Sequence, residues 1–252
     1  MFTPHGVSRH QPQMGLCTRA LKASRPFWRS LSTRPPARAS IPSRRDPPVP
    51  EPATTSHHDL HSFLEYAHRT NLNAKSPVYV GTHYEYTVSS TLAQYGLSLR
   101  RVGGASDYGI DLLGTWKLPS TEEPLRVLVQ CKAGAIGPHV IRELEGAFVG
   151  APVGWRESGV LGVLASRRVA TKGVGDALAR SRWPMVFVCC SADGVVSQVR
   201  WNQRAAEEAL EGVHAAVRHS GGKSGERIVL TWKGKSIAPV REGDGNDGNG
   251  PA

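Results

Sequence analysis

The sequence has few of the features that mark several large classes of protein. Four cysteines in 252 residues, with no C-x-x-C pair, argue against a disulfide scaffold or a zinc ribbon and favour a reducing compartment. The longest apolar stretches, residues 159–165 and Met185–Cys190, reach about a third of the ~20 residues that a membrane-spanning helix needs. The glycines between positions 103 and 175 form no G-x-G-x-x-G after a strand, and no G-x-x-x-x-G-K-S/T occurs. We therefore expect neither a membrane span nor a nucleotide cofactor.

Acidic residues are missing from the first 45 positions, although these hold nine of the 31 Lys and Arg residues. The rest of the chain has 22 basic and 21 acidic residues, so the net charge of +10 gives no independent case for a nucleic-acid-binding body. An Arg- and Ser-rich leader without acid is typical of a mitochondrial transit peptide, which predicts a protein of the mitochondrion and its matrix. A disordered basic arm that touches nucleic acid is the alternative interpretation.

Composition divides the chain into four segments. Residues 1–45 are predicted to be the transit peptide or disordered, and residues 46–55 are predicted to be a proline-rich linker. Residues 56–240 carry the folded domain. Residues 241–252 consist mainly of Gly, Asn and Asp with almost nothing to bury, which predicts a disordered tail.

Within the folded domain, the spacing of apolar residues alternates between the helical period of about 3.6 and the strand period of about 2. This spacing predicts helices at 56–70, 82–95, 171–182 and 202–218, and a further helix from Pro138 onward. It predicts strands at 97–102, 109–115, 125–133, 159–165, 185–190, 194–201 and 227–232. The order of these elements indicates an α/β sandwich with a mixed central sheet flanked by helices.

Four side chains have the types and the spacing that a metal-dependent nuclease needs: Glu85, Asp111, Gln130 and Lys132. Side chains alternate along the strand at 125–133, so Cys131 is expected to point into the core. Gln130 and Lys132 then project together from the opposite face. A solvated sheet face that merely carries these two polar residues is the alternative interpretation.

Asp111 is the carboxylate expected to complete this patch. It lies between Ile110 and Leu112, so it is expected to point away from their shared apolar face, and a lone carboxylate in such a segment costs free energy unless it is hydrogen-bonded or metal-bound. A hairpin between its strand and the next one would bring Asp111, Gln130 and Lys132 together. A carboxylate and an amide oxygen suit Mg²⁺, and an ammonium beside the metal can orient water or stabilise developing charge.

Two acidic candidates also have simple structural interpretations. The run from Thr82 to Glu85 matches a capping box, in which Glu85 would reach back to the Thr82 backbone. That role can coexist with a catalytic one or replace it. Asp107 has the sequence context of a turn residue within 103–109.

Histidines and arginines offer two further candidate sites. His57 and His61 have the i, i+4 spacing of a zinc pair, but no third ligand is evident and a solvated helix start is the favoured interpretation. Basic residues gather between the strand at 159–165 and the helix after it, where they form a solvated face or grip phosphates. These residues are Arg167, Arg168, Lys172, Arg180 and Arg182.

Several motifs together resemble a known family. The run from Gly103 to Leu112, followed by Val129-Gln130-Cys131-Lys132, resembles the Mrr branch of the PD-(D/E)xK restriction-endonuclease-like nucleases, in which Gln commonly replaces the acidic residue before x-Lys. Residues 142–147 also resemble that branch, and the similarity spans roughly residues 82–200. With residues 84–88 and the basic leader, the chain is most similar to the fungal mitochondrial family named "required for respiratory growth protein 7".

The resemblance implies a restriction-endonuclease-like fold and a role for each candidate residue. Asp111 would be the central metal ligand, Gln130 the second ligand and Lys132 the catalytic lysine. Glu85 would complete the metal site from a helix. The implied cofactor is Mg²⁺, and because Gln130 is neutral the site has one negative charge fewer than an Asp/Glu site and should hold the ion more weakly.

The implied function is that of a mitochondrial, Mg²⁺-dependent nuclease that hydrolyses DNA phosphodiester bonds and supports mitochondrial genome maintenance and respiratory growth. The alternative is a catalytically silent module of the same fold that binds nucleic acid or protein, which the near-neutral body and Gln130 favour. An RNA-processing nuclease would share the chemistry, so RNA stays open as a substrate. Because nuclease domains of this type often cut both strands as dimers, a homodimer stays open as the assembly.

Overall fold

The structure is a computed structural model that describes residues 56–104, 108–156, 159–219 and 226–237. All of these residues belong to one unit, which spans Arg44–Ala252. The predicted transit peptide at 1–45, the linker at 46–55 and the tail at 241–252 lie outside the described residues, and so does Asp107.

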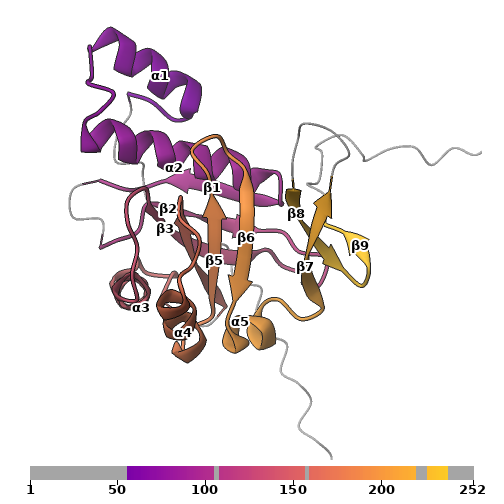
Figure 1. The fold of residues 1–252 in the computed structure, drawn as a ribbon. Coiled ribbons are helices and arrows are strands. Elements are labelled where there is room, and N and C mark those ends of the chain that lie inside the picture. The colour runs from indigo at the N-terminus through magenta and orange to yellow at the C-terminus, as the bar shows by residue number, and fades with distance from the viewer. Residues whose placement is uncertain (1–55, 105–107, 157–158, 220–225, 238–252) are drawn as a thin grey trace, which may run out of the picture. The chain divides into compact units, whose positions relative to one another are not determined.

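The order of helices and strands follows the predicted alternation (Figure 1). The helices are α1 (Leu60–Arg69), α2 (Pro77–Ala93), α3 (His139–Gly150), α4 (Lys172–Arg180) and α5 (Gln203–Glu208). The strands are β1 (Leu97–Arg101), β2 (Leu112–Trp116), β3 (Leu125–Lys132), β4 (Val160–Ser166), β5 (Met185–Cys190), β6 (Val196–Trp201), β7 (Val213–His219), β8 (Glu226–Trp232) and β9 (Lys235–Ser236). Within the described part of the chain, every helix is too short or too polar to cross a bilayer.

The central sheet has six strands in the order β1-β2-β3-β4-β5-β6. β1, β2 and β3 form an antiparallel meander, β4 and β5 continue the sheet parallel to β3, and β6 closes it antiparallel to β5. Parallel neighbours need a long crossover, and α3 and α4 supply it between β3, β4 and β5. The predicted α/β architecture with a mixed central sheet is therefore confirmed. A second sheet has the order β7-β8-β9.

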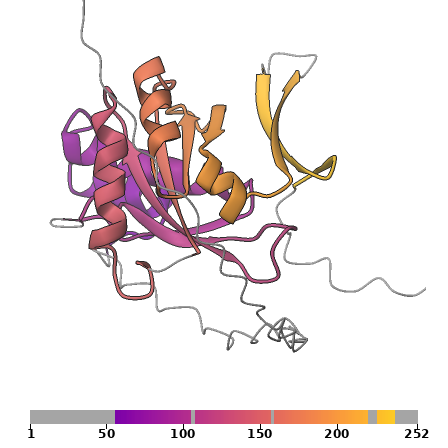
Figure 2. The same cartoon turned by 90° about the horizontal axis from the view of Figure 1, so that it is seen from below.

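The two faces of the central sheet carry separate hydrophobic cores. α2 packs on one face through residues such as Tyr84 and Val88, and the second sheet adds Leu230 to the same core. α3 and α4 cover the other face, where Figure 2 shows them side by side. Side chains of any central strand therefore alternate between a core under α2 and a core under α3 and α4.

α2 begins at Pro77, five residues before the predicted start at Thr82. The Ser76 hydroxyl accepts a hydrogen bond from the Tyr79 backbone N–H at 3.2 Å, and Pro77 takes the first helical position. Thr82 is buried inside the helix, so the predicted capping box between Thr82 and Glu85 is wrong. The apolar stripe of α2 begins only at Tyr84, and the first turn of the helix is stabilised by its cap instead. The spacing of apolar residues therefore predicted the start of the helix too late.

Residues 202–218 form a short helix and a strand rather than the single predicted helix. The Asn202 side chain caps α5 by accepting the Ala205 N–H at 3.0 Å, but α5 ends at Glu208. Gly212 then turns the chain with φ +73°, and β7 pairs antiparallel with β8. The pairing partner lies beyond the helix pattern in the sequence, so tertiary contacts override the local helical preference. β9 was not predicted.

α1 packs on α2 through an aromatic cluster. Asp59 caps α1 by accepting the Ser62 N–H at 2.7 Å, and Phe63 is buried between the two helices. The ring Nδ1 of His57 lies 2.7 Å from the Tyr86 hydroxyl, and only 8% of His57 is exposed. The expected solvated position is therefore wrong for His57. His61 is exposed and pairs with Glu65, so the two histidines occupy different environments and the zinc interpretation loses its support.

Replacement of Gly114 should disrupt the central sheet, because a Cβ there would lie 1.9 Å from the Ser98 carbonyl oxygen on β1. We expect Gly114→Ala to lower the free energy of unfolding by about 3 kcal/mol, the upper end for overpacked sites. Urea denaturation followed by circular dichroism measures this change. Gly146→Ala in α3 is the control, since its Cβ would meet nothing within 4 Å and should stabilise the helix by about 0.5–1 kcal/mol. Small and equal effects of the two substitutions would contradict the close approach of β1 to Gly114.

Stability should fall in mild acid because of His57. Burial, followed by the positive charges of Arg101 and His58, lowers the pKa of His57 below its ordinary value of 6.5. The folded protein then binds fewer protons than the unfolded chain, so stability is lost as pH falls through the unfolded pKa. We expect His57→Gln, which keeps a hydrogen-bonding group opposite Tyr86 but does not titrate, to flatten the fall in melting temperature between pH 7.5 and about pH 5. An identical pH dependence in the variant would show that His57 is not the group responsible.

Candidate functional site

Three of the four predicted site residues meet at the carboxyl end of β3. The Asp111 Oδ2 accepts a hydrogen bond from the Cys131 backbone N–H at 2.6 Å. Cys131 lies between Gln130 and Lys132 and packs against the core under α2, as the alternation predicted. Gln130 and Lys132 therefore leave β3 toward the α3 face. The predicted hairpin of β2 and β3 is also confirmed.

The chain departs from regular pairing at Asp111. Leu112 is the register partner of Val129, and the Val129 carbonyl also accepts the Asp111 N–H at 2.9 Å, so two successive residues face one residue of β3. Ile110 consequently packs in the core under α3, whereas Leu112 packs in the core under α2. The expectation that Ile110 and Leu112 share one face is therefore wrong. The irregular pairing, rather than strand alternation, turns the Asp111 carboxylate toward the end of β3.

Two glycines leave room around the Asp111 and Gln130 side chains. A Cβ at Gly103 would lie 3.3 Å from Asp111 Oδ1, and a Cβ at Gly109 would lie 3.1 Å from Gln130 Nε2. Gly109 also has φ +79°, a conformation that favours glycine. The backbone on either side of residues 105–107 thus approaches both polar side chains closely.

Gln130 has a buried acceptor with no partner. Only 4% of the residue is exposed, and its Oε1 has no hydrogen bond among the residues that the structure describes. An unmade hydrogen bond at a buried polar atom costs about 1–3 kcal/mol. This cost contradicts the interpretation of Gln130 as decoration of a solvated face. A cation at this position would supply the missing partner.

Lys132 is held by a carboxylate from α3. Its Nζ lies 2.6 Å from Glu143 Oε2, with 30% of the lysine side chain and 42% of the glutamate side chain exposed. At this exposure the pair contributes at most about 1 kcal/mol, so it orients the ammonium more than it stabilises the fold. Sequence analysis did not predict a role for Glu143. Its contact with Lys132 exists only because α3 crosses over β3, and sequence spacing does not show that crossing.

Glu85 approaches the same strand end from the opposite layer. It lies inside α2 and forms a largely buried ion pair with Arg101 of β1. Burial, with the negative charges of Asp111 and then Glu85, raises the pKa of the Cys131 thiol, so both carboxylates lie within electrostatic reach of Cys131. The Glu85 carboxylate is thus already paired with Arg101, as Lys132 is paired with Glu143.

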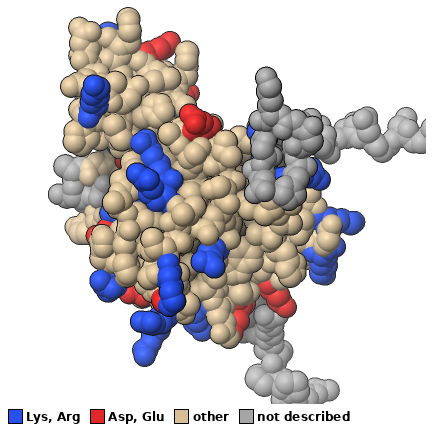
Figure 3. All heavy atoms as spheres, in the orientation of Figure 1, with Lys and Arg blue, Asp and Glu red and all other residues tan. Residues whose placement is uncertain are grey.

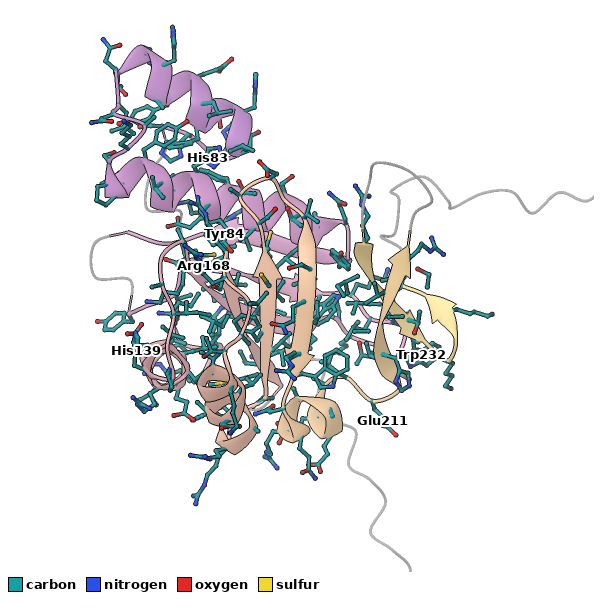
Figure 4. The ribbon with its side chains drawn as sticks, viewed as in Figure 1. His83, Tyr84, His139, Arg168, Glu211 and Trp232 are labelled. Carbon is teal, nitrogen blue, oxygen red and sulfur yellow. The ribbon has the colours of Figure 1, made fainter. Side chains whose placement is uncertain are left out.

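The predicted group of five basic residues divides into two. Arg167 and Arg168 follow β4 directly, whereas Arg180 ends α4, a nine-residue helix about 13 Å long. Lys172 pairs with Asp176 on the α4 surface. In the view of Figure 4, Arg168 lies below Tyr84 of α2, and Figure 3 shows several Lys and Arg side chains on this face of the molecule.

Arg167 has a specific environment within this group. Its guanidinium carbon lies 4.8 Å from the centre of the Tyr84 ring, and its Nε is buried without a hydrogen-bond partner among the described residues. Stacking on an aromatic ring contributes about 0.5–2 kcal/mol, which is no more than the ~1–3 kcal/mol lost at the unmet donor. Packing on Tyr84 therefore does not by itself account for an arginine at this position.

Metal binding at this site would rest on mixed oxygen ligands rather than on a cluster of acids. No group of three or more His, Cys, Asp or Glu side chains is placed to hold a metal ion in the part of the chain that the structure describes. Gln130 belongs to none of these four residue types. A site made from Asp111, Gln130 and Glu85 therefore has only two carboxylates, one of which is paired with Arg101.

Comparison with known proteins shows that the chain is similar to fungal proteins that are named mitochondrial. It is 34% identical to an uncharacterised mitochondrial protein of Schizosaccharomyces pombe, over 60% of this chain and 62% of that protein. It is 26% identical to "Required for respiratory growth protein 7, mitochondrial" of Saccharomyces cerevisiae, over 46% of this chain and 66% of that protein. The protein of the same name in Eremothecium gossypii is 33% identical, over 33% of this chain and 51% of that protein. The chain thus spans less than two thirds of the length of each of these relatives.

A family model matches the chain over residues 76–123 and 118–218. The matched region runs from the cap of α2 into β7 and includes all four predicted site residues as well as Glu143. The match extends over more than half of the 252 residues. The chain therefore belongs to the family described as "Required for respiratory growth protein 7".

Proposed function

We propose that this protein is a mitochondrial, Mg²⁺-dependent nuclease of restriction-endonuclease-like fold that hydrolyses DNA phosphodiester bonds. The names of the relatives support the mitochondrial location and a role in respiratory growth, to which maintenance of the mitochondrial genome would contribute. The observation that carries the proposal is the Asp111 carboxylate bound to the N–H between Gln130 and Lys132, beside an unpartnered Gln130 oxygen.

The residues at this strand end fit a hard divalent cation. Gln130 Oε1 is a buried acceptor without a hydrogen bond among the described residues, and Asp111 supplies a carboxylate close to Gly103. Oxygen ligands of these two kinds are those that Mg²⁺ prefers. Because Gln130 is neutral, the ion would be held more weakly than between two acids. Glu85 would join the site only by exchanging its partner Arg101.

The chemistry follows from the placement of these groups. When bound, Mg²⁺ supplies polarisation of the scissile phosphate. Asp111 and Gln130 hold the ion through their oxygens. Lys132, which Glu143 orients, donates from its ammonium to the attacking water and to the charge that develops on the phosphate.

A second candidate function is a silent module that binds nucleic acid or protein. The specific observation in its favour is that three candidate groups already have protein partners: Asp111 with Cys131, Glu85 with Arg101 and Lys132 with Glu143. In that case these pairs would serve the fold, and the Gln130 oxygen would be left over from an earlier metal site.

Cleavage of plasmid DNA by the purified protein in Mg²⁺ is the direct test of the nuclease. We expect Asp111→Asn and Lys132→Ala each to reduce the rate by about a hundredfold or more, the usual loss for a catalytic group. Asp176→Asn on the α4 surface is the matched control and should leave the rate unchanged. An RNA of the same sequence replaces the plasmid in a parallel assay. Absence of cleavage of both substrates, with binding that EDTA leaves unchanged, would select the silent module.

Gln130→Glu tests the metal site without any activity assay. A second buried carboxylate beside Asp111 is uncompensated in the metal-free protein and should lower the free energy of unfolding by about 3–5 kcal/mol. Mg²⁺ should restore much of this loss, since an ion at a hundred times its Kd contributes about 2.7 kcal/mol. The measurement is the melting temperature in EDTA and in Mg²⁺. Gln198→Glu, whose amide accepts the Ala170 N–H elsewhere in the sheet, is the control and should show no response to Mg²⁺. A Gln130→Glu variant that Mg²⁺ does not stabilise would remove Gln130 from the metal site.

A further inference from the structure

Arg167 is the immediate neighbour of Lys132 across the parallel pair of β3 and β4. Its backbone N–H donates to the Lys132 carbonyl at 3.3 Å, and Ser166, the residue before it, is the register partner of Lys132. Both strands end here at their carboxyl ends. A long side chain at position 167 therefore starts from the same edge of the sheet as the proposed metal site, although it leaves toward α2 rather than α3.

The guanidinium of Arg167 is held against a fixed surface. The Tyr84 ring beneath it is 1% exposed, and the Tyr84 hydroxyl donates to the Cys190 carbonyl at 3.0 Å. An arginine stacked on a rigid ring keeps the planar edge of its guanidinium available for an oxyanion. The Tyr84 ring is thus a platform that orients Arg167.

The positive charge of Arg167 contacts the Tyr84 ring but has no acidic partner among the described residues. None of the ion pairs between described residues involves Arg167, and its Nε has no hydrogen-bond partner among them. Arg168, the next residue along the chain, is exposed and adds a second guanidinium after β4. At this edge of the sheet Glu85 is paired with Arg101 and Glu143 with Lys132, so Arg167 and Arg168 are the cations that favour an anionic ligand.

We propose that Arg167 binds a backbone phosphate of nucleic acid next to the phosphate that the Asp111, Gln130 and Lys132 group handles. The identity of the ligand as nucleic acid rests on the proposed function, whereas the oxyanion site itself rests on the geometry of Arg167. The planar guanidinium takes two phosphate oxygens through paired N–H donors, and Arg168 adds charge without fixed geometry. Arg167 is therefore a substrate-positioning residue rather than a group that touches the scissile bond.

A purely structural role for Arg167 gives different expectations. In that case Arg167 would serve to pack α2 on the sheet through Tyr84, and its replacement would change stability alone. Binding of phosphate, in contrast, releases counterions and makes affinity depend on salt with a slope of about −0.9 per contact in duplex DNA. The salt slope is therefore the measurement that separates the two roles.

The experiment measures binding of a fluorescein-labelled DNA duplex to the full-length protein by anisotropy, in EDTA, between about 50 and 200 mM NaCl. We expect Arg167→Gln to reduce the magnitude of the slope of log K against log salt by about one and to weaken binding roughly tenfold at the lowest salt. Arg167→Lys should keep the slope but bind more weakly than wild type, because an ammonium lacks the two-pronged edge. Arg204→Gln, which removes an arginine paired with Glu208 on α5, is the control of equal charge and should match wild type.

An unchanged slope in Arg167→Gln, or an Arg204→Gln variant that loses as much, would overturn the assignment. Inorganic phosphate and a mononucleotide are tested as competitors, and displacement of the duplex by either at low millimolar concentration would replace the nucleic acid with a small phosphate ligand. The binding assay contains EDTA, so it does not depend on the metal site. If Arg167→Gln weakens binding but the wild type cleaves nothing, the phosphate site at Arg167 stands and the proposed nuclease activity is wrong. If the wild type cleaves DNA but Arg167→Gln binds as well as wild type, the nuclease activity stands and the phosphate site at Arg167 is wrong.

Discussion

The hydrogen bond from the Cys131 backbone N–H to the Asp111 carboxylate determines the geometry of the candidate site. It replaces a regular ladder bond at the point where β2 and β3 lose their register, so a side chain takes the place of a backbone acceptor. Because Cys131 separates Gln130 from Lys132, this one bond places the carboxylate next to an amide and an amine. The close approach of Gly103 to Asp111 depends on the same irregularity.

The surrounding groups divide into those with protein partners and those without. Glu85 pairs with Arg101 and Lys132 pairs with Glu143, so the helices on both faces of the sheet hold charges at this edge. Among the described residues, the Gln130 oxygen and the Arg167 Nε are buried without hydrogen bonds. An unmatched acceptor and an unmatched cationic donor at neighbouring strand ends suit a cation and an oxyanion bound side by side, which is the arrangement that a phosphodiester and a metal ion present.

Periodicity and composition predicted most of the elements because their local signals agree with the fold. The alternation along β3 correctly placed Cys131 in the core and Gln130 and Lys132 on the other face. The same method failed where a long-range contact decided the outcome. β7 forms because β8 lies beside it. The start of α2 was missed for a local reason, because its first turn has a cap at Ser76 and no apolar stripe. Ile110 and Leu112 separate because the pairing at Asp111 is irregular.

The sequence alone determined the family, the element order and the side chains available for chemistry, since each of these depends on residue type and short-range spacing. Only the tertiary structure decided which partner each side chain has. The sequence around Glu85 is typical of a capping residue, but the packing of α2 against β1 pairs Glu85 with Arg101. In the same way, the crossing of α3 over β3 brings Glu143 to Lys132. Such pairings depend on how helices lie across a twisted sheet, and that orientation results from the summed packing of two cores rather than from any local pattern.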